Sequence, residues 1–359
     1  MGCAGLVAVG CLLLLAACVP ADVPPTVKIG LVAPFEGRYR EIGYDVIWAV
    51  RLAVREYNLA REPGAALVEL VAYDDAGDPA LAAEQVRKLA ADPQVLGAIG
   101  HWHGETTRVA APLYADLVLP LVTAESESSI YAFTMGPDDE ELAAGLLSQL
   151  GPASRLGPVV IVGPETGLSA AFSQTLHARG GGVVLHVAPG TPDWLGRVRA
   201  AAPQAVFLSD DSVAAADALA LLSAGRVRAQ WLGGPALAEA EFLRIAGAAA
   251  ENALVVTGAR PPVDLPGLGD FPTRYGAVAF GGAQPGAHAA PAYEAACVLL
   301  DAVRRASRQD LATRAGVTHA LASTRRDGVL GTVYFDARRH WPAAPVAVYR
   351  IHAGALTEP

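Results

Sequence analysis

Two short polar turns carry the side chains of this 359-residue chain that are best suited to chemistry. The first turn is Trp102-His103-Gly104-Glu105 and the second is Ala124-Glu125-Ser126-Glu127. An indole ring face and several carboxylates could hold a cation by ring contact and by charge pairing. The pattern therefore predicts a binding site for a small polar molecule. Two further candidates from other turns are expected to face this site: Arg38 and Asp210.

A βαβ unit is expected to position both turns. Val95–Gly100 and Leu119–Val122 are short apolar runs without alternation, as expected for parallel strands that helices cover on both faces. Between them, Thr106–Asp116 has apolar residues at roughly helical spacing. In open parallel sheets, ligands bind beyond the carboxyl ends of the strands, where loops and helix N-termini converge. The two turns lie at such strand ends, so we expect them to share one site.

The rest of the chain repeats the same alternation. From Val27 to Thr257, predicted strands and helices follow one another almost without exception, which is typical of doubly wound parallel sheets. The length indicates about two domains of roughly 150 residues each. No linker rich in Gly, Ser or Pro divides the middle of the chain. Two domains without a linker imply several short crossovers, which is a hinge arrangement.

Composition excludes some classes of partner and activity. The chain is 52% hydrophobic and 18% charged, with a net charge of −9 and no basic cluster, so we expect no nucleic-acid partner. His101 and His103 alternate as metal ligands could, but no third ligand has metal spacing, and we expect no metal. No phosphate-binding, dinucleotide-binding or nucleophile-elbow motif occurs in a suitable context, so we expect no cofactor and no enzyme activity. A hydrolase with Glu125 and Asp210 as acid and base is the remaining enzymatic alternative.

The N-terminal segment resembles an export signal. Leu6–Ala17 is apolar and too short to span a bilayer with ease, and Leu15-Ala16-Ala17-Cys18 has the lipobox pattern of a bacterial lipoprotein. We expect residues 1–18 to form the lipoprotein signal and lipobox, Cys18 to be lipidated, and residues 19–25 to be a tether. Because the segment before the apolar run has no Lys or Arg, a plain secretory signal and an uncleaved anchor stay open. After processing only Cys297 would remain as a thiol, so no disulfide framework is expected.

Ordered motifs connect the chain to a known family. Ile29-Gly30-Leu31-Val32-Ala33-Pro34 opens the series, Gly136-Pro137-Asp138-Asp139 follows the central unit, and Gly331-Thr332-Val333-Tyr334-Phe335-Asp336 ends it. In this order and spacing, they resemble the periplasmic solute-binding proteins of the branched-chain amino acid and amide ABC-importer family. Other matching pieces are Tyr73-Asp74-Asp75, Gly97-Ala98-Ile99-Gly100, Ala111-Pro112-Leu113-Tyr114 and Leu119-Pro120-Leu121-Val122. The resemblance covers about Val27 to Gly354.

This resemblance implies a fold, a function and a partner. The fold would be two doubly wound parallel-sheet lobes joined by three crossover strands: residues 26–135 plus 258–330, and residues 136–257 plus 331–354. The function would be to capture a small molecule between the lobes and to present it to ABC permease subunits. The protein would work outside the cytoplasm, anchored to the bacterial cell membrane through the lipobox. A ligand-sensing receptor of the same fold that signals to a partner is the alternative.

The matched pocket positions depart from the family's usual grip on an α-amino acid. Gly104 and Glu127 stand where hydroxyl residues are expected, Thr166 where an aromatic is expected, and Pro235 where an acid is expected. With acidic candidates in excess, we expect a ligand that carries a positive charge or an amine, paired with Glu127. The alternative is an anionic or zwitterionic ligand met by Arg38 and by the helix N-terminus near Thr106.

Overall fold

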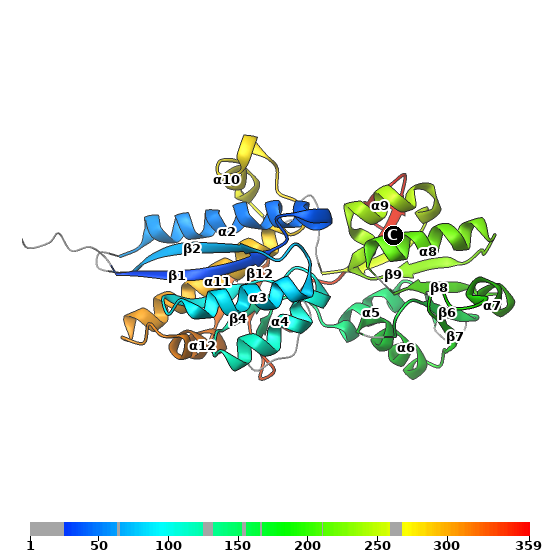
Figure 1. Ribbon diagram of the computed structural model, residues 1–359, viewed down its shortest axis with the longest axis horizontal. Coiled ribbons are helices and arrows are strands. Elements are labelled where there is room, and N and C mark those ends of the chain that lie inside the picture. Colours follow the sequence, from blue (N-terminus) through cyan, green and yellow to red (C-terminus); the bar gives the residue numbers. More distant parts are fainter. Residues whose placement is uncertain are drawn as a thin grey trace, which may run out of the picture.

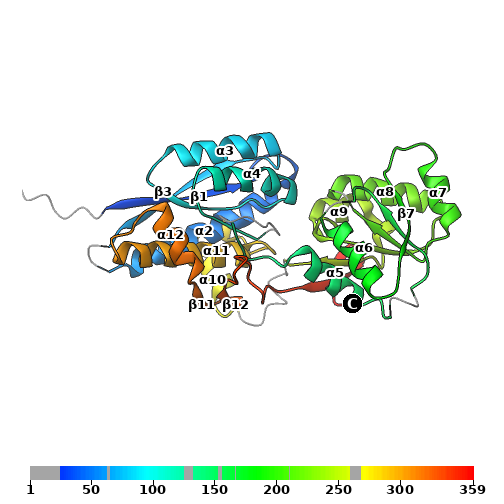
Figure 2. The ribbon, with the colours of Figure 1, turned by 90° about the horizontal axis from the view of Figure 1, so that it is seen from below.

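The computed structural model describes residues 25–62, 65–124, 132–152, 156–165, 167–209, 211–258 and 268–359. Two α/β lobes lie end to end along the long axis of the molecule, and thin segments of chain connect them (Figures 1 and 2). Among the described residues, no helix is long and apolar enough to cross a membrane.

Lobe 1 is built on a five-stranded parallel sheet in the order β2-β1-β3-β4-β5. Its middle strands are buried along most of their length because helices cover both faces, which explains why their sequences are mostly apolar. The strands are β1 (Thr26–Ala33), β2 (Leu67–Asp74), β3 (Val95–Ile99), β4 (Leu121–Thr123) and β5 (Ala132–Thr134).

Helices of lobe 1 form one layer on each face of this sheet (Figure 2). On one face, α3 (Pro79–Ala91) and α4 (Gly104–Asp116) pack against the strands, and on the other lie α2 (Arg40–Ala60), α11 (Ala289–Arg308) and α12 (Arg314–Ala322). Asp78 begins α3 by accepting a hydrogen bond from the backbone of Leu81, with Pro79 at the first helical position. The smaller α10 (Phe271–Gly276) and the 3-10 helices η1 (Gly37–Tyr39) and η6 (Phe280–Gly282) complete the lobe.

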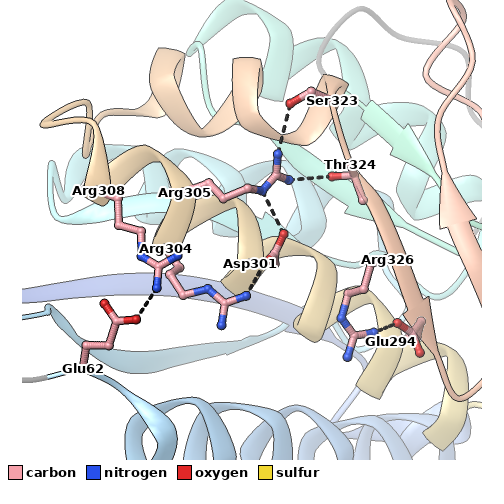
Figure 3. A network of polar contacts seen from close by, with 9 residues as sticks. All are labelled: Glu62, Glu294, Asp301, Arg304, Arg305, Arg308, Ser323, Thr324 and Arg326. Atoms are coloured by element: carbon pink, nitrogen blue, oxygen red, sulfur yellow. Dashed lines mark hydrogen bonds and ion pairs between the residues drawn. The ribbon is translucent and has the colours of Figure 1, made fainter.

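A hairpin of β11 (Arg325–Gly328) and β12 (Gly331–Tyr334) is fixed to α11 by polar contacts (Figure 3). The fully buried Glu294 carboxylate pairs with Arg326 and accepts a hydrogen bond from the Val329 amide at 2.7 Å. The contacts of Arg305 with Ser323 and Thr324, at 3.0 and 3.1 Å, join α11 to the chain just after α12. These contacts stabilise the end of lobe 1 around a charge that would otherwise be costly to bury.

The division of the lobes expected at residue 330 is therefore misplaced. Val333 and Trp341 are buried in the core of lobe 1, and the Trp341 indole donates to the Thr332 carbonyl at 3.1 Å. Only β13 (Ala347–His352) and β14 (Ala355–Thr357) from the C-terminal part join the sheet of lobe 2. Apolar side chains of the hairpin complete the first core, and this burial keeps the chain with lobe 1 until about Pro345.

Lobe 2 contains a seven-stranded sheet in the order β14-β13-β10-β9-β8-β6-β7, in which β13 and β14 pair antiparallel to their neighbours. Helices α5 and α6 cover one face, and α7, α8 and α9 cover the other. The remaining strands are β6 (Val159–Val162), β7 (Val183–Val187), β8 (Ala205–Leu208), β9 (Gln230–Gly233) and β10 (Leu254–Thr257). The helices are α5 (Asp139–Ser148), α6 (Leu168–Ala178), α7 (Trp194–Ala201), α8 (Ser212–Ala224) and α9 (Ala240–Ala246), with 3-10 helices η3 (Pro235–Ala238) and η4 (Gly247–Ala250).

Three crossovers between the lobes lie side by side. The first, after β5, pairs with the third through a parallel bridge between Thr134 and His340 and through the Trp341 amide, which donates to the Thr134 carbonyl at 2.9 Å. The second begins at Gly258, where an added Cβ would overlap Pro137 and would lie 3.6 Å from the Pro345 carbonyl oxygen. The predicted fold of two α/β lobes joined by crossovers is confirmed, and such an arrangement permits hinge motion between the lobes.

Candidate functional site

A cavity of about 210 Å³ lies between the lobes, at the carboxyl ends of strands from both sheets. We call it the cleft cavity. Apolar residues form most of its wall, and its charged side chains among the described residues are Asp139 and Glu239. Its lining is Ile42, Trp102, Ala124, Met135, Gly136, Pro137, Asp139, Leu142, Leu168, Pro235, Ala238, Glu239, Thr257, Gly258, Ala287, His288, Pro291, Leu330, Pro345 and Leu356.

A second cavity of about 510 Å³ adjoins the first and shares Ile42, Glu239 and His288 with it. More charged side chains line it, and its wall includes Arg38 and Tyr39 from η1 together with residues at the start of α9. Both lobes contribute to each cavity, so a molecule held here would contact the two halves of the protein at once.

A row of buried polar side chains holds the turn after β3 in place. His101 Nδ1 lies 2.7 Å from the Asp75 carboxylate, and both side chains are almost completely buried. His101 Nε2 lies 3.4 Å from the Tyr114 hydroxyl, whose pKa is raised by burial. Because both ring nitrogens of His101 are directed at these partners, His101 and His103 do not converge as a metal-binding pair. These hydrogen-bonded side chains hold the turn that places Trp102 in the wall of the cleft cavity.

Trp102 is 4% exposed and packs edge-on against His288, with ring centroids 6.3 Å apart. Its indole nitrogen is buried and donates no hydrogen bond to any residue that the structure describes. His288 comes from lobe 1 just before α11, and burial lowers the pKa of its imidazole. An indole and a neutral imidazole therefore form the lobe 1 side of the cleft cavity.

His103 joins the two lobes without being charged at neutral pH. Its ring lies 3.8 Å from the Tyr39 ring, and its Nε2 lies 3.7 Å from Glu239 Oε1 in lobe 2. Burial is the main cause that lowers the pKa of His103 to about 4, and the nearby His288 lowers it further. At pH 7 the contact with Glu239 is accordingly a polar contact and not a salt bridge.

Arg38 makes a second contact between the lobes. Its guanidinium lies 3.7 Å from the Asp211 carboxylate, with both side chains about half exposed. Asp211 also begins α8 by accepting hydrogen bonds from the Val213 and Ala214 amides at 2.8 and 3.0 Å. Arg38 thus faces lobe 2 as expected, but its partner is an acid of the protein. Tyr39 beside it has a raised pKa, mainly because of burial and also because of nearby Glu239.

Asp139 is one of the cleft residues that sequence reasoning missed, together with Glu239 and His288. It stands at the start of α5, where Asp138 and Glu141 form a capping box with distances of 2.8 and 2.9 Å. Among the described residues, none donates a hydrogen bond to the Asp139 carboxylate or forms an ion pair with it. Burial, and to a lesser degree the neighbouring Asp138, raises its pKa to about 6. A Cβ added to Gly167 would lie 3.3 Å from its Oδ2, which places the carboxylate against the start of α6.

The other predicted residues divide into three groups. Trp102 and Ala124 line the cleft cavity, and Arg38 lines the second cavity. Gly104 and Glu105 line neither; Glu105 is exposed in the first turn of α4 and faces Arg108 at 3.7 Å, as a surface pair one helical turn apart does. The predicted residues Glu125, Ser126, Glu127, Thr166 and Asp210, like Cys18, lie outside the described residues.

Asp138, Glu141 and His340 are the one group of acidic and histidine residues in the described chain whose atoms lie close enough to hold a metal ion. Two of the three already form the capping box. His340 Nε2 lies 3.1 Å from the Gly136 carbonyl oxygen and 3.4 Å from Glu141 Oε2. The arrangement joins the third crossover to the first and to α5, so its role is at the hinge.

The chain is similar to proteins of one family. Its sequence matches the family described as periplasmic binding protein over residues 26–355. No curated protein sequence gives a significant match. Among solved structures, a putative branched-chain amino acid ABC transporter from Rhodospirillum rubrum is 26% identical, with a TM-score of 0.65 over 93% of this chain and 100% of that one.

Two further structures support the same fold. A leucine-binding protein from Thermotoga maritima is 23% identical, with a TM-score of 0.77 over 92% of this chain and 97% of that one. A solute-binding protein from R. palustris in complex with benzoate is 17% identical, with a TM-score of 0.72 over 92% and 95% of the two chains. The family match spans both lobes and all three crossovers, and the chain belongs to the periplasmic binding protein family.

Proposed function

We propose that this protein is the extracytoplasmic solute-binding component of an ABC importer, which captures a small ligand in the cleft cavity and presents it to the permease subunits. The observation that carries the proposal is a cavity lined by both lobes and bordered by the crossovers at Gly136, Gly258 and Pro345. A ligand that contacts both walls favours the closed arrangement by its differential affinity. Closure then creates a surface that differs from that of the empty protein.

The anchoring part of the proposal rests on sequence. Cys18 at the end of the lipobox is the proposed lipidation site, and residues 19–25 are the proposed tether to β1. Stable attachment follows from two or more acyl chains, whereas a single chain is marginal. The protein would work at the outer face of the bacterial cell membrane, beside its permease.

The ligand class is drawn from the relatives and the cleft together. The similar structures include a leucine-binding protein and a protein in complex with benzoate. Leucine and benzoate are both small molecules with an apolar body. The apolar wall of the cleft cavity fits such a body, and the polar part would belong to an amino acid, an amide or an amine. Trp102, His103, Ala124, Arg38 and the described acids are proposed contacts. Glu125, Ser126, Glu127, Thr166 and Asp210 stay proposed from their positions in the sequence.

A thermal-shift screen against amino acids, amides, amines and aromatic acids tests the function. A ligand at about 100 times its Kd adds roughly 2.7 kcal/mol to the free energy of unfolding. Each hit is then measured by small-angle X-ray scattering, in which closure reduces the radius of gyration. A library without hits, or hits that leave the radius of gyration unchanged, would contradict the proposed function.

A further inference from the structure

The Asp139 carboxylate has no partner among the described residues, and it lies in a place where this is costly. It lies in the wall of the cleft cavity, and no hydrogen bond or ion pair connects it to the residues that the structure describes. A carboxylate in an apolar surrounding costs free energy unless a cation or hydrogen-bond donors compensate it. Asp138 and Glu141 already complete the cap of α5, so the helix does not require Asp139.

The charges around the cleft cavity favour a positive ligand. Lining residues from the described chain include Asp139 and Glu239 but neither Lys nor Arg. The histidine on the opposite wall, His288, has a pKa lowered by burial and contributes no positive charge at neutral pH. A cation would therefore meet a negative wall on lobe 2, with the Trp102 ring on lobe 1 as an additional favourable surface.

The rest of the wall specifies the body of the ligand. Leu142 and Leu168 flank Asp139 from α5 and α6, and Pro291 and Leu330 face them from lobe 1. These side chains make favourable contacts with an apolar ligand surface and offer a large polar molecule few hydrogen bonds.

We propose that the cleft takes an apolar molecule that carries a primary amine, and that Asp139 is the residue that pairs with the amine. This inference rests on the proposed function and narrows its ligand class. Pairing through Asp139 would join a ligand that packs on lobe 1 to lobe 2, so the same contact that confers charge selectivity also favours closure.

The test uses two sets of ligands. The members of each set have the same apolar group and differ in the charge of the polar group attached to it. Isoamylamine, 4-methylpentanamide and 4-methylpentanoate form an aliphatic set, and phenethylamine, 3-phenylpropanamide and 3-phenylpropanoate form an aromatic one. Isothermal titration at pH 7.5 should give the amine at least a tenfold lower Kd than the amide and the acid in at least one set. If the acid or the amide binds as well as the amine in both sets, or if no amine binds, the inference is overturned.

The variant Asp139→Asn tests whether Asp139 is the residue that pairs with the amine. The variant should lose at least tenfold in amine affinity and should bind the neutral amide as the wild type does. Glu140→Gln is the matched control, because Glu140 is the exposed neighbour in the same helical turn and lies outside the cavity lining. Unchanged amine affinity in Asp139→Asn would overturn the role of Asp139.

A pH profile separates this carboxylate from its neighbours. At pH 5, about one unit below its pKa, roughly one Asp139 in ten stays ionised, so wild-type amine affinity should fall about tenfold from its value at pH 7.5. Asp138 lies beside this group, and Glu239 and His288 also line the cavity. Any pH dependence that remains in Asp139→Asn belongs to those groups; a profile as steep as that of the wild type contradicts the inference.

The outcomes also separate this inference from the proposed function. A hit from the broad screen that is an anion and compacts the protein leaves the solute-binding function in place and overturns the amine. Absence of any compacting ligand overturns both.

Discussion

Four acidic residues follow one another at the start of α5, and they do different things. Asp138 and Glu141 satisfy backbone amides in the capping box, Glu140 is exposed, and Asp139 lies in the wall of the cleft cavity, where none of the described residues pairs with it. In the sequence all four are typical of a helix N-terminus, where acidic residues complement the dipole. Only the packing of α6 against α5 distinguishes Asp139 from the others.

Asp139→Asn should make the empty protein more stable at pH 7.5. The pKa of Asp139 is about 6 in the folded protein and near its ordinary value of 3.8 in the unfolded chain, so the unfolded chain releases this proton more easily. The group destabilises the folded state fully above pH 6, and the effect disappears as the pH falls below about 4. A shift of this size corresponds to roughly 2 kcal/mol after allowance for partial exposure.

Urea denaturation at pH 7.5 and pH 4 measures this effect. The gain of Asp139→Asn should be present at the higher pH and small at the lower one, whereas Glu140→Gln should gain nothing at either. A variant less stable than the wild type at pH 7.5 would show that the carboxylate has a favourable partner in the empty protein.

At the scale of elements, the two acids at the end of β2 shape two turns of the cleft. Asp74 Oδ1 accepts hydrogen bonds from the Phe35 amide at 2.7 Å and the Ala76 amide at 2.9 Å, which fixes the turn before η1. Asp75 contacts His101 at 2.7 Å and accepts from the Gly77 amide at 3.0 Å. One strand end therefore positions both the Tyr39 turn and the Trp102 turn.

Asp75→Ala should destabilise the protein and weaken ligand binding together. Removal of one partner from a buried polar pair costs about 3 kcal/mol, and the freed His101 loosens the turn that carries Trp102. Asp78→Ala is the control three residues away, because loss of that helix cap costs about 1 kcal/mol without a contact to the cleft. Chemical denaturation and titration with a ligand from the screen measure both effects. Wild-type affinity in folded Asp75→Ala would refute the link to the site.

The order of elements could be predicted because buried strands and helices have characteristic patterns of apolar residues in the sequence. The apolar runs Val95–Gly100 and Leu119–Val122 predicted β3 and β4, and the helix expected over Thr106–Asp116 lies within α4. The short α7 was missed, since Trp194–Ala201 offers two buried residues, too few for a helical period. Of the residues that line the cleft cavity, Trp102 and Ala124 could be proposed because they lie in turns just after strands, whereas His288 and Asp139 reach the cavity through tertiary packing.

At the scale of the whole molecule, the crossovers determine how the lobes can move. The sequence predicted several crossovers but assigned β12 to the wrong lobe, because nothing local shows that Val333 and Trp341 fill the core of lobe 1. Gly136 lies where the first crossover passes the turn after β4, and an added Cβ would overlap the Ala124 carbonyl oxygen. Backbone packing this close leaves the hinge little tolerance for larger residues.

Gly136→Ala should therefore cost about 1–3 kcal/mol of stability, as overpacking of a buried position does. It should also change the ligand-induced decrease in the radius of gyration, because the first crossover has to shift. Gly182→Ala is a suitable control: its Cβ would have nothing within 4 Å, so the expected effect is within about 0.5 kcal/mol. Thermal unfolding and scattering with and without ligand measure both variants. Equal behaviour of the two alanines would exclude a tight hinge.

Cys18→Ser should move the protein from the membrane fraction to the soluble fraction, because the acyl chains are proposed to be its only hold on the bilayer. Cys297→Ser is the control, since that thiol is enclosed in α11 and burial raises its pKa to about 12. Fractionation and mass spectrometry of the mature N-terminus decide the outcome. An unmodified N-terminus at another residue would disprove the anchor.

The position of Trp102 gives the protein a built-in optical reporter. Of five tryptophans, Trp194, Trp231 and Trp341 are buried in cores away from the cleft cavity, Trp48 borders the second cavity, and Trp102 alone of these lines the first. Its emission wavelength depends on whether water or ligand lies against the ring. With Trp48→Phe to remove the nearest background, occupancy of the cleft could be followed by intrinsic fluorescence in real time, without a dye and in the intact protein.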